Sequence, residues 1–406
     1  MQPPQFWQTE PDAPAWQARV LRPVSALFAA ATARRVRQEG YAASVPVICI
    51  GNINVGGTGK TPTAIALVQR LIAMGRSPHI VSRGYGGSLA GPVQVAAQGV
   101  DEVGDEPLLL AAFAPTWVAK DRAEGVRAAE AAGADVIVLD DGFQNPALAK
   151  DISVIVIDAA TGFGNGRVMP AGPMREPSAD GLQRANFALI IGEPKARQGF
   201  LAANNLPLPA LLASLQPLQT GMDWEGMRCV AFAGIGRPEK FFDTLAAQGA
   251  NIVSRHAFAD HAPFRHDLLK RLTAEAKSLG AQLVTTEKDA ARLPAEFRGQ
   301  VLVLPVRLQI DDDAGLWSAL EALNRAVLPA RQRIEKSLYR ALHRDLTDAV
   351  ERAAAAPKAQ TEAIADELTR ARQDLGWFAD RLETKNTPGL GWLQQALAGP
   401  SAPEPA

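Results

Sequence analysis

The sequence contains few residues of the types on which exported and metal-rich proteins depend. Its 406 residues include two cysteines and five histidines. Both cysteines, Cys49 and Cys229, lie in apolar runs typical of buried strands, which favours inert thiols over a disulfide or a metal site. The sequence therefore predicts a reducing, cytosolic compartment.

Long apolar runs and a net charge are also missing. No segment approaches the roughly 18 to 20 consecutive apolar residues of a transmembrane helix, and the N-terminus lacks the basic start and apolar core of a signal peptide. The net charge of −1 gives no general attraction to nucleic acid, so we expect no nucleic-acid partner. A hydrophobic content of 47% is typical of globular proteins, and the length predicts at least two domains.

A glycine-rich loop is the strongest local signal. It follows the apolar run Val47–Ile50 and precedes a helical pattern, as a phosphate-binding loop does. Backbone N–H groups of such a loop converge on phosphates, Lys60 reaches the β- and γ-phosphates of a nucleoside triphosphate, and the Thr61 hydroxyl can ligate Mg²⁺. Asn54 replaces the usual first glycine, but asparagine also tolerates the left-handed conformation. The predicted nucleotide-binding residues are Asn54, Val55, Gly56, Gly57, Thr58, Gly59, Lys60 and Thr61.

Apolar strand-like runs alternate with helical patterns from residue 47 to residue 191. This alternation predicts an α/β fold of the P-loop NTPase type, a mainly parallel sheet with helices on both faces. We expect strands at Val47–Ile50, His79–Ser82, Thr116–Ala119, Val136–Leu139, Val154–Ile157 and Ala188–Ile191. We expect helices at Thr63–Ala73, Glu106–Phe113 and Arg122–Ala132.

A second, smaller α/β domain is predicted after a linker near Gln216–Glu225. Its expected strands are Cys229–Phe232, Ile252–Arg255, Leu283–Thr285 and Val301–Val306, and its expected helices are Pro238–Ala247 and Pro263–Leu279. The predicted domains are N-terminal helices over residues 1–40, a P-loop domain over 41–222, the second domain over 223–330 and a helical extension over 331–406.

Acidic residues stand where ligands bind in such folds, beyond the carboxyl ends of the strands. Asp105 and Glu106 open a predicted helix, where they complement its dipole or take part in catalysis, and both interpretations stay open. Asp140 and Asp141 end an apolar strand, as a Mg²⁺-ligating Walker B element does. On this pattern the candidate metal ligands are Thr61, Asp140 and Asp141.

Arginines in the loops are candidate ligands for an anionic substrate, since a guanidinium group binds phosphate with two parallel hydrogen bonds. Arg83 follows the second strand in a glycine-rich turn, and a plain turn is an equal alternative there. Two further arginines lie in a long loop over residues 164–177, and long loops in compact domains are usually functional. The candidate substrate-binding residues are Arg83, Arg122, Arg167 and Arg175.

The first forty residues predict two short helices, the second beginning at Pro23 and ending at Gly40. Their apolar residues recur at helical spacing and are accompanied by arginines and tryptophans, a composition suited to a bilayer interface. A helix packed on the protein with solvated arginines is the alternative. The recurring apolar residues are Trp16, Val20, Val24, Leu27 and Ala31.

The last seventy residues carry two further helical patterns whose apolar spacing is typical of a short coiled coil or a helical hairpin. We expect these helices to pair with each other or with a protein partner. The final residues, from Gly399, have a composition typical of disorder.

Seven motifs occur in a fixed order along the chain. They are the glycine loop, Ser82-Arg83-Gly84-Tyr85-Gly86, Gly104-Asp105-Glu106-Pro107, Asp140-Asp141-Gly142-Phe143-Gln144, Pro170-Ala171-Gly172-Pro173, Asp260-His261 and Thr286-Glu287-Lys288-Asp289. Together they resemble the tetraacyldisaccharide 4'-kinase family of lipid A biosynthesis. The resemblance covers the chain from about Phe6 to about Leu328. It implies transfer of the ATP γ-phosphoryl group to the 4'-hydroxyl of a tetraacylated glucosamine disaccharide 1-phosphate, with Mg²⁺, at the cytoplasmic face of the bacterial inner membrane. Because that substrate lies in the membrane, the resemblance favours the interfacial interpretation of the N-terminal helices.

The resemblance also implies residue roles. Asp105 matches the family's catalytic base, His261 matches the histidine that supports it, and Lys60 lies in the phosphate loop. Glu106, Asp140, Asp141 and Gln144 match positions around the metal and the nucleotide.

The sequence disfavours two other functional classes. A membrane-associated nucleotide switch usually has a lysine where this sequence has Val55, and a GTPase needs a different spacing between Lys288 and Asp289. A partner-binding scaffold with a degenerate nucleotide site is disfavoured by the intact Lys60, Thr61 and strand-end acids.

Overall fold

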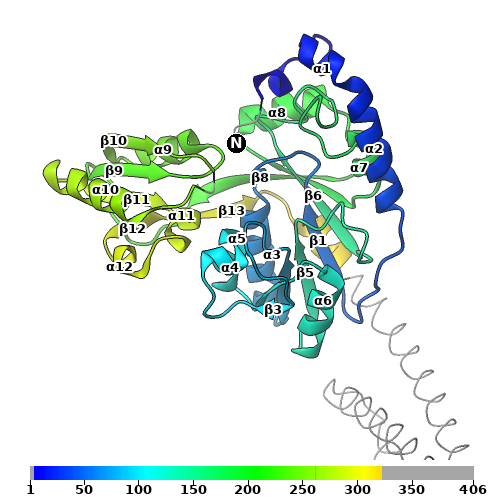
Figure 1. Ribbon diagram of the computed structural model, residues 1–406, viewed down its shortest axis with the longest axis horizontal. Helices are drawn as coiled ribbons and strands as arrows, with labels where there is room; N and C mark the ends of the chain where they lie inside the picture. The colour runs from blue at the N-terminus through cyan, green and yellow to red at the C-terminus, as the bar shows by residue number, and fades with distance from the viewer. Residues whose placement is uncertain (1–3, 261, 322–406) are drawn as a thin grey trace, which may run out of the picture. The chain divides into compact units, whose positions relative to one another are not determined.

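The computed structural model describes residues 4–260 and 262–321. The predictions made for His261 and for the helical extension over residues 331–406 lie outside these described residues. Two β-sheets make up the framework of the described part (Figure 1).

The larger sheet has nine strands in the order β13-β8-β7-β6-β1-β5-β2-β4-β3. All neighbouring pairs are parallel except β3 with β4 and β13 with β8. The strands from β7 to β2 are buried along their whole length, as expected for a sheet with both faces covered. The strands are β1 (Val47–Gly51), β2 (Pro78–Ser82), β3 (Val93–Gln94), β4 (Thr116–Val118), β5 (Val136–Asp140), β6 (Ile152–Asp158), β7 (Phe187–Ile191), β8 (Ala210–Pro217) and β13 (Val306–Ile310).

Two hydrophobic cores cover the faces of this sheet. Because side chains alternate along a strand, Ile48 and Ile50 of β1 face α3 (Lys60–Ala73) and α5 (Asp105–Ala111). Val47 and Cys49 face the other core, to which α6 (Arg122–Ala131), α7 (Ser178–Gln183) and α8 (Pro194–Ala203) contribute. Cys49 is a buried free thiol, as predicted for its position in a strand, and burial raises the pKa of this thiol to about 12.

The smaller sheet is wholly parallel, in the order β10-β9-β11-β12. Its first strand in the sequence, β9, lies between β10 and β11, so the strand order reverses there. The elements are β9 (Arg228–Ala233), α9 (Pro238–Ala247), β10 (Asn251–Ala257), α10 (His266–Ser278), β11 (Gln282–Thr286), α11 (Glu287–Ala291), α12 (Ala295–Arg298) and β12 (Val301–Leu304).

The predicted fold class is confirmed, and most predicted strands and helices differ from the observed ones only by shifted ends. The single strand predicted at Val301–Val306 is wrong. Pro305 lacks an N–H group for a sheet ladder, so β12 ends before it and β13 begins after it in the other sheet. β13 pairs antiparallel with β8, which occupies part of the segment predicted as a linker.

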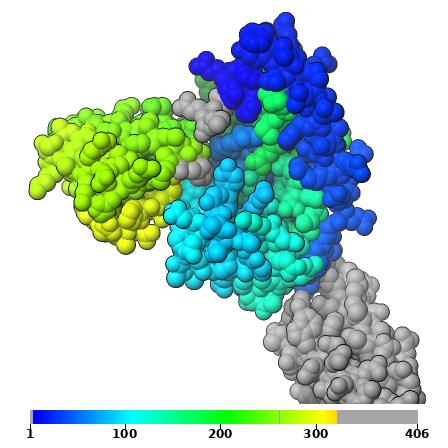
Figure 2. Space-filling model, viewed as in Figure 1, coloured from blue at the N-terminus to red at the C-terminus, as the bar shows by residue number. Residues whose placement is uncertain are grey.

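The N-terminal segment forms the two expected helices, α1 (Trp16–Val20) and α2 (Arg22–Val36), after a 3₁₀ turn at Gln5–Gln8. Their buried residues are small or polar: Ala18, Ser25 and Thr32. The apolar residues face outward instead, since Trp16 is 69% exposed and Leu27 is 73% exposed. Figure 2 shows both helices, in blue, on the surface of the protein. None of the described helices is long and apolar enough to span a bilayer.

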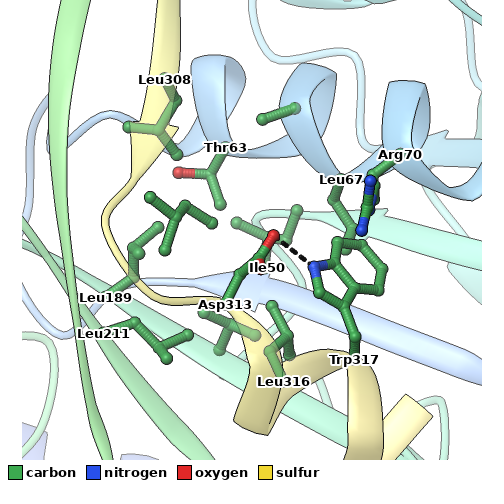
Figure 3. A pocket seen from close by; sticks show the side chains of 13 residues that line it. Ile50, Thr63, Leu67, Arg70, Leu189, Leu211, Leu308, Asp313, Leu316 and Trp317 are labelled. Atoms are coloured by element: carbon green, nitrogen blue, oxygen red, sulfur yellow. Dashed lines mark hydrogen bonds between the residues drawn. The ribbon is translucent and has the colours of Figure 1, made fainter. Parts of the chain in front are cut away.

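A cavity of about 340 Å³ lies between α3, the nine-stranded sheet and the helical residues that begin at Ala314 (Figure 3). Leucine, isoleucine and valine side chains make up most of its wall, and Trp317 donates a hydrogen bond to Asp313 at one end. Among the described residues, Arg70 is the one cation that lines this cavity, and the lining includes none of the glycine-loop residues whose N–H groups would bind phosphate. The candidate site therefore lies elsewhere, at the carboxyl ends of the parallel strands.

Candidate active site

The glycine loop after β1 forms an open cradle at the N-terminus of α3. Gly56 and Gly59 adopt left-handed conformations, with φ of 113° and 100°. Both conformations are strained for any residue with a Cβ, and a Cβ at Gly59 would also lie 2.6 Å from Cδ1 of Ile191. Gly56 and Gly57 have open space beside them. An open loop at a helix N-terminus is suited to bind an anion, because both the N–H groups and the helix dipole favour negative charge.

Asn54, the first residue of this loop, stabilises it through a hydrogen bond that the sequence did not predict. Among the described residues Asp141 is the one non-glycine residue with positive φ, so Asn54 does not use the left-handed conformation expected of it. Its side-chain amide instead donates a hydrogen bond of 2.6 Å to the carbonyl of Gly162. The N–H of Val55 donates to the carbonyl of Pro173, at 2.8 Å. The long loop over residues 164–177 therefore supports the glycine loop.

Asp141, which follows β5, contacts three cationic side chains. Arg175 donates two hydrogen bonds to its carboxylate, of 2.8 and 3.2 Å, and Lys60 Nζ lies 3.8 Å from it. Arg122 donates to its backbone carbonyl, at 2.8 Å. Burial alone would raise the pKa of Asp141, but Lys60 and Arg175 outweigh burial and hold that pKa below its ordinary value.

Asp140, the last residue of β5, lies in a different environment. It is 1% exposed, and one carboxylate oxygen accepts a hydrogen bond of 3.3 Å from the Ser82 hydroxyl. The other oxygen is buried without a hydrogen-bond partner among the described residues. Burial, together with the charges of Glu106 and Asp141, raises the pKa of Asp140 to about 7. A buried oxygen beside a phosphate-binding loop suits a divalent cation.

Gln144 and Glu176 are linked to Asp141 through Arg175, which donates hydrogen bonds to both Asp141 and Gln144. The Gln144 amide donates to the carbonyl of Asn52, at 2.8 Å, and to the Glu176 carboxylate, at 2.9 Å. Glu176 is 2% exposed and forms an ion pair with Arg184. The sequence interpretation missed Glu176, although its position directly after Arg175 in a long loop was an available signal.

Asp105 and Glu106 begin α5, where Asp105 is 4% exposed. The Asp105 Oδ1 atom accepts a hydrogen bond of 3.0 Å from the N–H of Glu106. Its Oδ2 atom lies 3.7 Å from Lys288 Nζ and 3.8 Å from Arg292 Nε, which belong to the smaller sheet's segments. The charge of Glu106 also acts on Asp140, so the start of α5 and the end of β5 share one site.

The four arginines predicted to bind substrate lie in different environments. Arg83 is exposed and its charge acts on Arg122, which is buried. Burial lowers the pKa of Arg122, although Asp141 and Asp140 oppose this. Arg175 pairs with Asp141, and Arg167 is half-buried in the loop that supports the glycine loop. Their contact with a substrate stays a prediction.

The described residues contain no cluster of three or more histidine, cysteine, aspartate or glutamate side chains able to hold a metal on their own. Mg²⁺ does not need such a cluster, because it usually takes one or two carboxylates, waters and substrate phosphates as ligands. Asp140, Asp141 and Thr61 around the glycine loop fit that arrangement.

A parallel sheet whose central strand leads into a glycine loop and a helix, with an acidic strand end beside them, defines a P-loop nucleotide-binding protein. A family model described as tetraacyldisaccharide-1-P 4'-kinase matches residues 17–325. The chain therefore belongs to the tetraacyldisaccharide 4'-kinase family.

Relatives of known name agree with this assignment. A tetraacyldisaccharide 4'-kinase from Dinoroseobacter shibae is 62% identical over 329 residues, which cover 80% of this chain and 98% of the relative. One from a Jannaschia species is 54% identical and covers 79% of this chain and 98% of the relative. The crystal structure of LpxK from Aquifex aeolicus in complex with ATP has a TM-score of 0.62 and 23% identity, over 75% of this chain and 99% of that chain. At this identity the structure supports the fold alone.

Gly104 fixes where α5 begins, which leads to a prediction about stability. Its φ is +87°, and a Cβ there would lie 2.4 Å from the carbonyl oxygen of Tyr85. Gly133 has a similar φ of +92° but open space around it. We expect Gly133→Ala to cost about 1 to 2 kcal/mol for its conformation, and Gly104→Ala to cost clearly more because of the added clash. Urea unfolding of both variants measures the difference, and equal losses would contradict the close approach to Tyr85.

The environment of Asp140 predicts how stability depends on pH without divalent cations. The folded protein, with an Asp140 pKa of about 7, holds this proton more tightly than the unfolded chain, where the pKa is 3.8. The stability contributed by Asp140 is therefore present at low pH and is lost as pH rises from about 4 to about 7. Asp140→Asn stays neutral, so it should stabilise the protein at pH 8, relative to wild type, by roughly 2 to 4 kcal/mol more than at pH 4. Urea unfolding in a chelator checks this, and a difference independent of pH would refute it.

Proposed function

We propose that this protein transfers the γ-phosphoryl group of ATP to the 4'-hydroxyl of a tetraacylated glucosamine disaccharide 1-phosphate. The observation that carries the proposal is the convergence of three groups at one edge of the sheet: the glycine loop with Lys60, the acidic end of β5, and the buried Asp105. A phosphate cradle, a metal-binding carboxylate and a base are the parts that phosphoryl transfer to a hydroxyl requires. Membership of the tetraacyldisaccharide 4'-kinase family supplies the identity of the two substrates.

The residues divide the work of this reaction. The N–H groups of the glycine loop and the Lys60 ammonium bind the phosphates and neutralise the charge that develops during transfer. Asp105 accepts the proton of the attacking hydroxyl, and its burial keeps bulk water away from the reacting atoms. Arg175 and Lys60 hold Asp141 in place beside the phosphates.

Mg²⁺ fits the residues beside the glycine loop. Asp140 offers a buried oxygen without a hydrogen-bond partner among the described residues, and Thr61 carries its hydroxyl in the first turn of α3, next to the loop. When bound, Mg²⁺ would offset the negative charge of the nucleotide phosphates. It would also offset the repulsion between Asp140 and its acidic neighbours Asp141 and Glu106.

The outward-facing apolar residues of α1 and α2 support docking on the inner membrane, at its cytoplasmic face. A lipid substrate with four acyl chains resides in a bilayer, and exposed tryptophan and leucine side chains beside arginines suit its interface. The small buried side chains of these helices leave the apolar ones available for lipid.

The direct test is transfer of labelled phosphate from ATP to the disaccharide 1-phosphate in detergent micelles with Mg²⁺. We expect Lys60→Ala to lower kcat by about 10² to 10³, the usual loss for one group that stabilises transferred charge. Lys195→Ala, at an exposed lysine of α8, serves as the control and should keep full activity. ATP hydrolysis by the wild-type protein without lipid phosphorylation would instead favour a nucleotide switch.

Membrane docking is tested separately. Replacing Trp16 and Leu27 together by glutamate should weaken sedimentation with liposomes at least tenfold, since burying each apolar side chain is worth about 1.5 kcal/mol or more. Ile72 and Leu279 are also exposed, at 46% and 37%, but lie on α3 and after α10, so their double replacement by glutamate is the matched control. Equal sedimentation of the two double variants would reject the role of the N-terminal helices.

A further inference from the structure

The smaller sheet has a feature that normally marks a ligand site. Because β9 lies between β10 and β11, the strand order reverses between β9 and β11, and open parallel sheets bind ligands at the carboxyl ends of the strands beside such a reversal. The two loops that leave this point are residues 234–237, after β9, and the start of α11, after β11. α11 packs against α5 of the larger sheet (Figure 1). An acidic side chain of α5 therefore lies near the place where a sheet of this kind binds a ligand.

That side chain is Asp105, and its two carboxylate oxygens have different partners. Oδ1 accepts the N–H of Glu106, at 3.0 Å, within its own helix. Oδ2 faces two cations from the other sheet, Lys288 Nζ at 3.7 Å and Arg292 Nε at 3.8 Å. Lys288 and Arg292 thereby contribute to the position and orientation of this carboxylate.

Lys288 balances a cluster of negative charge. Its ammonium nitrogen lies 3.8 Å from Glu106 Oε1 and 3.5 Å from Asp260 Oδ1, in addition to its contact with Asp105. The Lys288 side chain is 20% exposed and that of Asp105 is 4% exposed, so solvent screens their attraction less than at an open surface. Three carboxylates at this spacing would repel one another without the central cation.

The backbone around Lys288 is fixed from both sides. The Thr286 hydroxyl caps α11 by accepting the N–H of Asp289, at 3.1 Å. Asp289 is fully buried and accepts the N–H of Gly234, at 2.9 Å, which joins the β11 loop to the β9 loop. On the other side Glu287 forms an ion pair of 2.7 Å with Arg307 of β13, the strand that joins the larger sheet.

Arg292 is the second cation beside Asp105, but unlike Lys288 it also holds the backbone of the smaller sheet's loops together. Its guanidinium group is 5% exposed, donates to the carbonyls of Gly234 and Ala262, and pairs with Asp289. Replacing Arg292 would leave several buried groups without partners and would destabilise the domain. Lys288 forms ion pairs with three carboxylates, those of Asp105, Glu106 and Asp260, so the effect of its charge on Asp105 can be measured in a variant.

We propose that Lys288 is a positioning residue for the phosphoryl transfer: it holds the Asp105 carboxylate in the orientation that accepts the proton of the attacking hydroxyl. This inference rests on the proposed function. Lys288 acts through Asp105 and does not itself contact the nucleotide. The carboxyl ends of β9 and β11, where a ligand would bind in such a sheet, thus hold the Asp105 side chain of α5.

The test compares two variants at this position and one elsewhere. Lys288→Met keeps most of the length of the side chain and removes its charge. It should lower kcat about 10- to 100-fold, the scale of misplacing a reacting group by about 1 Å. The KM for ATP should not change. Lys288→Arg should recover part of the loss because the charge is retained. Lys270→Met, at an exposed lysine of α10, is the control and should behave as wild type.

A double-mutant cycle with Asp105→Asn decides whether Lys288 acts through Asp105. If it does, Lys288→Met should have almost no further effect on kcat once Asp105 is replaced. Losses that multiply, or a raised KM for ATP with kcat unchanged, would overturn the proposal, because Lys288 would then act independently or on the nucleotide. Wild-type kcat in Lys288→Met would overturn it as well.

A second readout needs no lipid substrate and separates failure of this inference from failure of the proposed function. Amide hydrogen exchange in the first turn of α5 should speed up in Lys288→Met and stay unchanged in Lys270→Met. If wild type does not phosphorylate the lipid, the proposed function fails, while the exchange data still show whether Lys288 holds Asp105. Unchanged exchange in Lys288→Met would refute the positioning role.

Discussion

The carboxylate of Asp141 connects the segments from which the nucleotide site is built. It receives Arg175 from the long loop over residues 164–177 and lies beside Lys60 at the start of α3, while its backbone carbonyl receives Arg122 from α6. Asp141 has positive φ, a conformation that costs energy for any residue other than glycine. The surrounding cations hold the residue in that conformation. The geometry of the glycine loop, the loop that braces it and the acidic strand end therefore depend on one ionised side chain.

Asp140 shows that adjacent residues of one sequence motif can have opposite electrostatic properties. Asp141 is surrounded by cations and has a lowered pKa, whereas Asp140 is buried beside two acidic neighbours and has a raised one. The raised value means that the site, without a cation, destabilises the folded protein at neutral pH. Such a cost is typical of residues kept for chemistry rather than for folding.

The sequence was sufficient to predict the features that depend on neighbouring residues. Strands, helices and the glycine loop follow from apolar periodicity and from glycine positions, so the fold class and the residues around Lys60 could be predicted. Pairings between distant segments could not, because nothing in residues 306–310 or 210–217 specifies that they form a ladder in the larger sheet. The contact of Lys288 with Asp105 was missed for the same reason: the motifs were recognised separately, and their distance in space is set by packing of α11 on α5.

The antiparallel pair of β8 and β13 has a consequence for synthesis on the ribosome. The chain leaves the larger sheet after β8 and returns to it with β13, so the whole smaller sheet is made between two neighbouring strands of the larger one. During translation the edge of β8 has no partner until residues 306–310 emerge, by which time every strand of the smaller sheet has been synthesised. Unpaired strand edges promote association between chains. The nascent protein must therefore protect β8 through an interval of about 90 residues, roughly 5 to 20 seconds at usual translation rates, and folding of the smaller sheet within that interval would bring β13 to it.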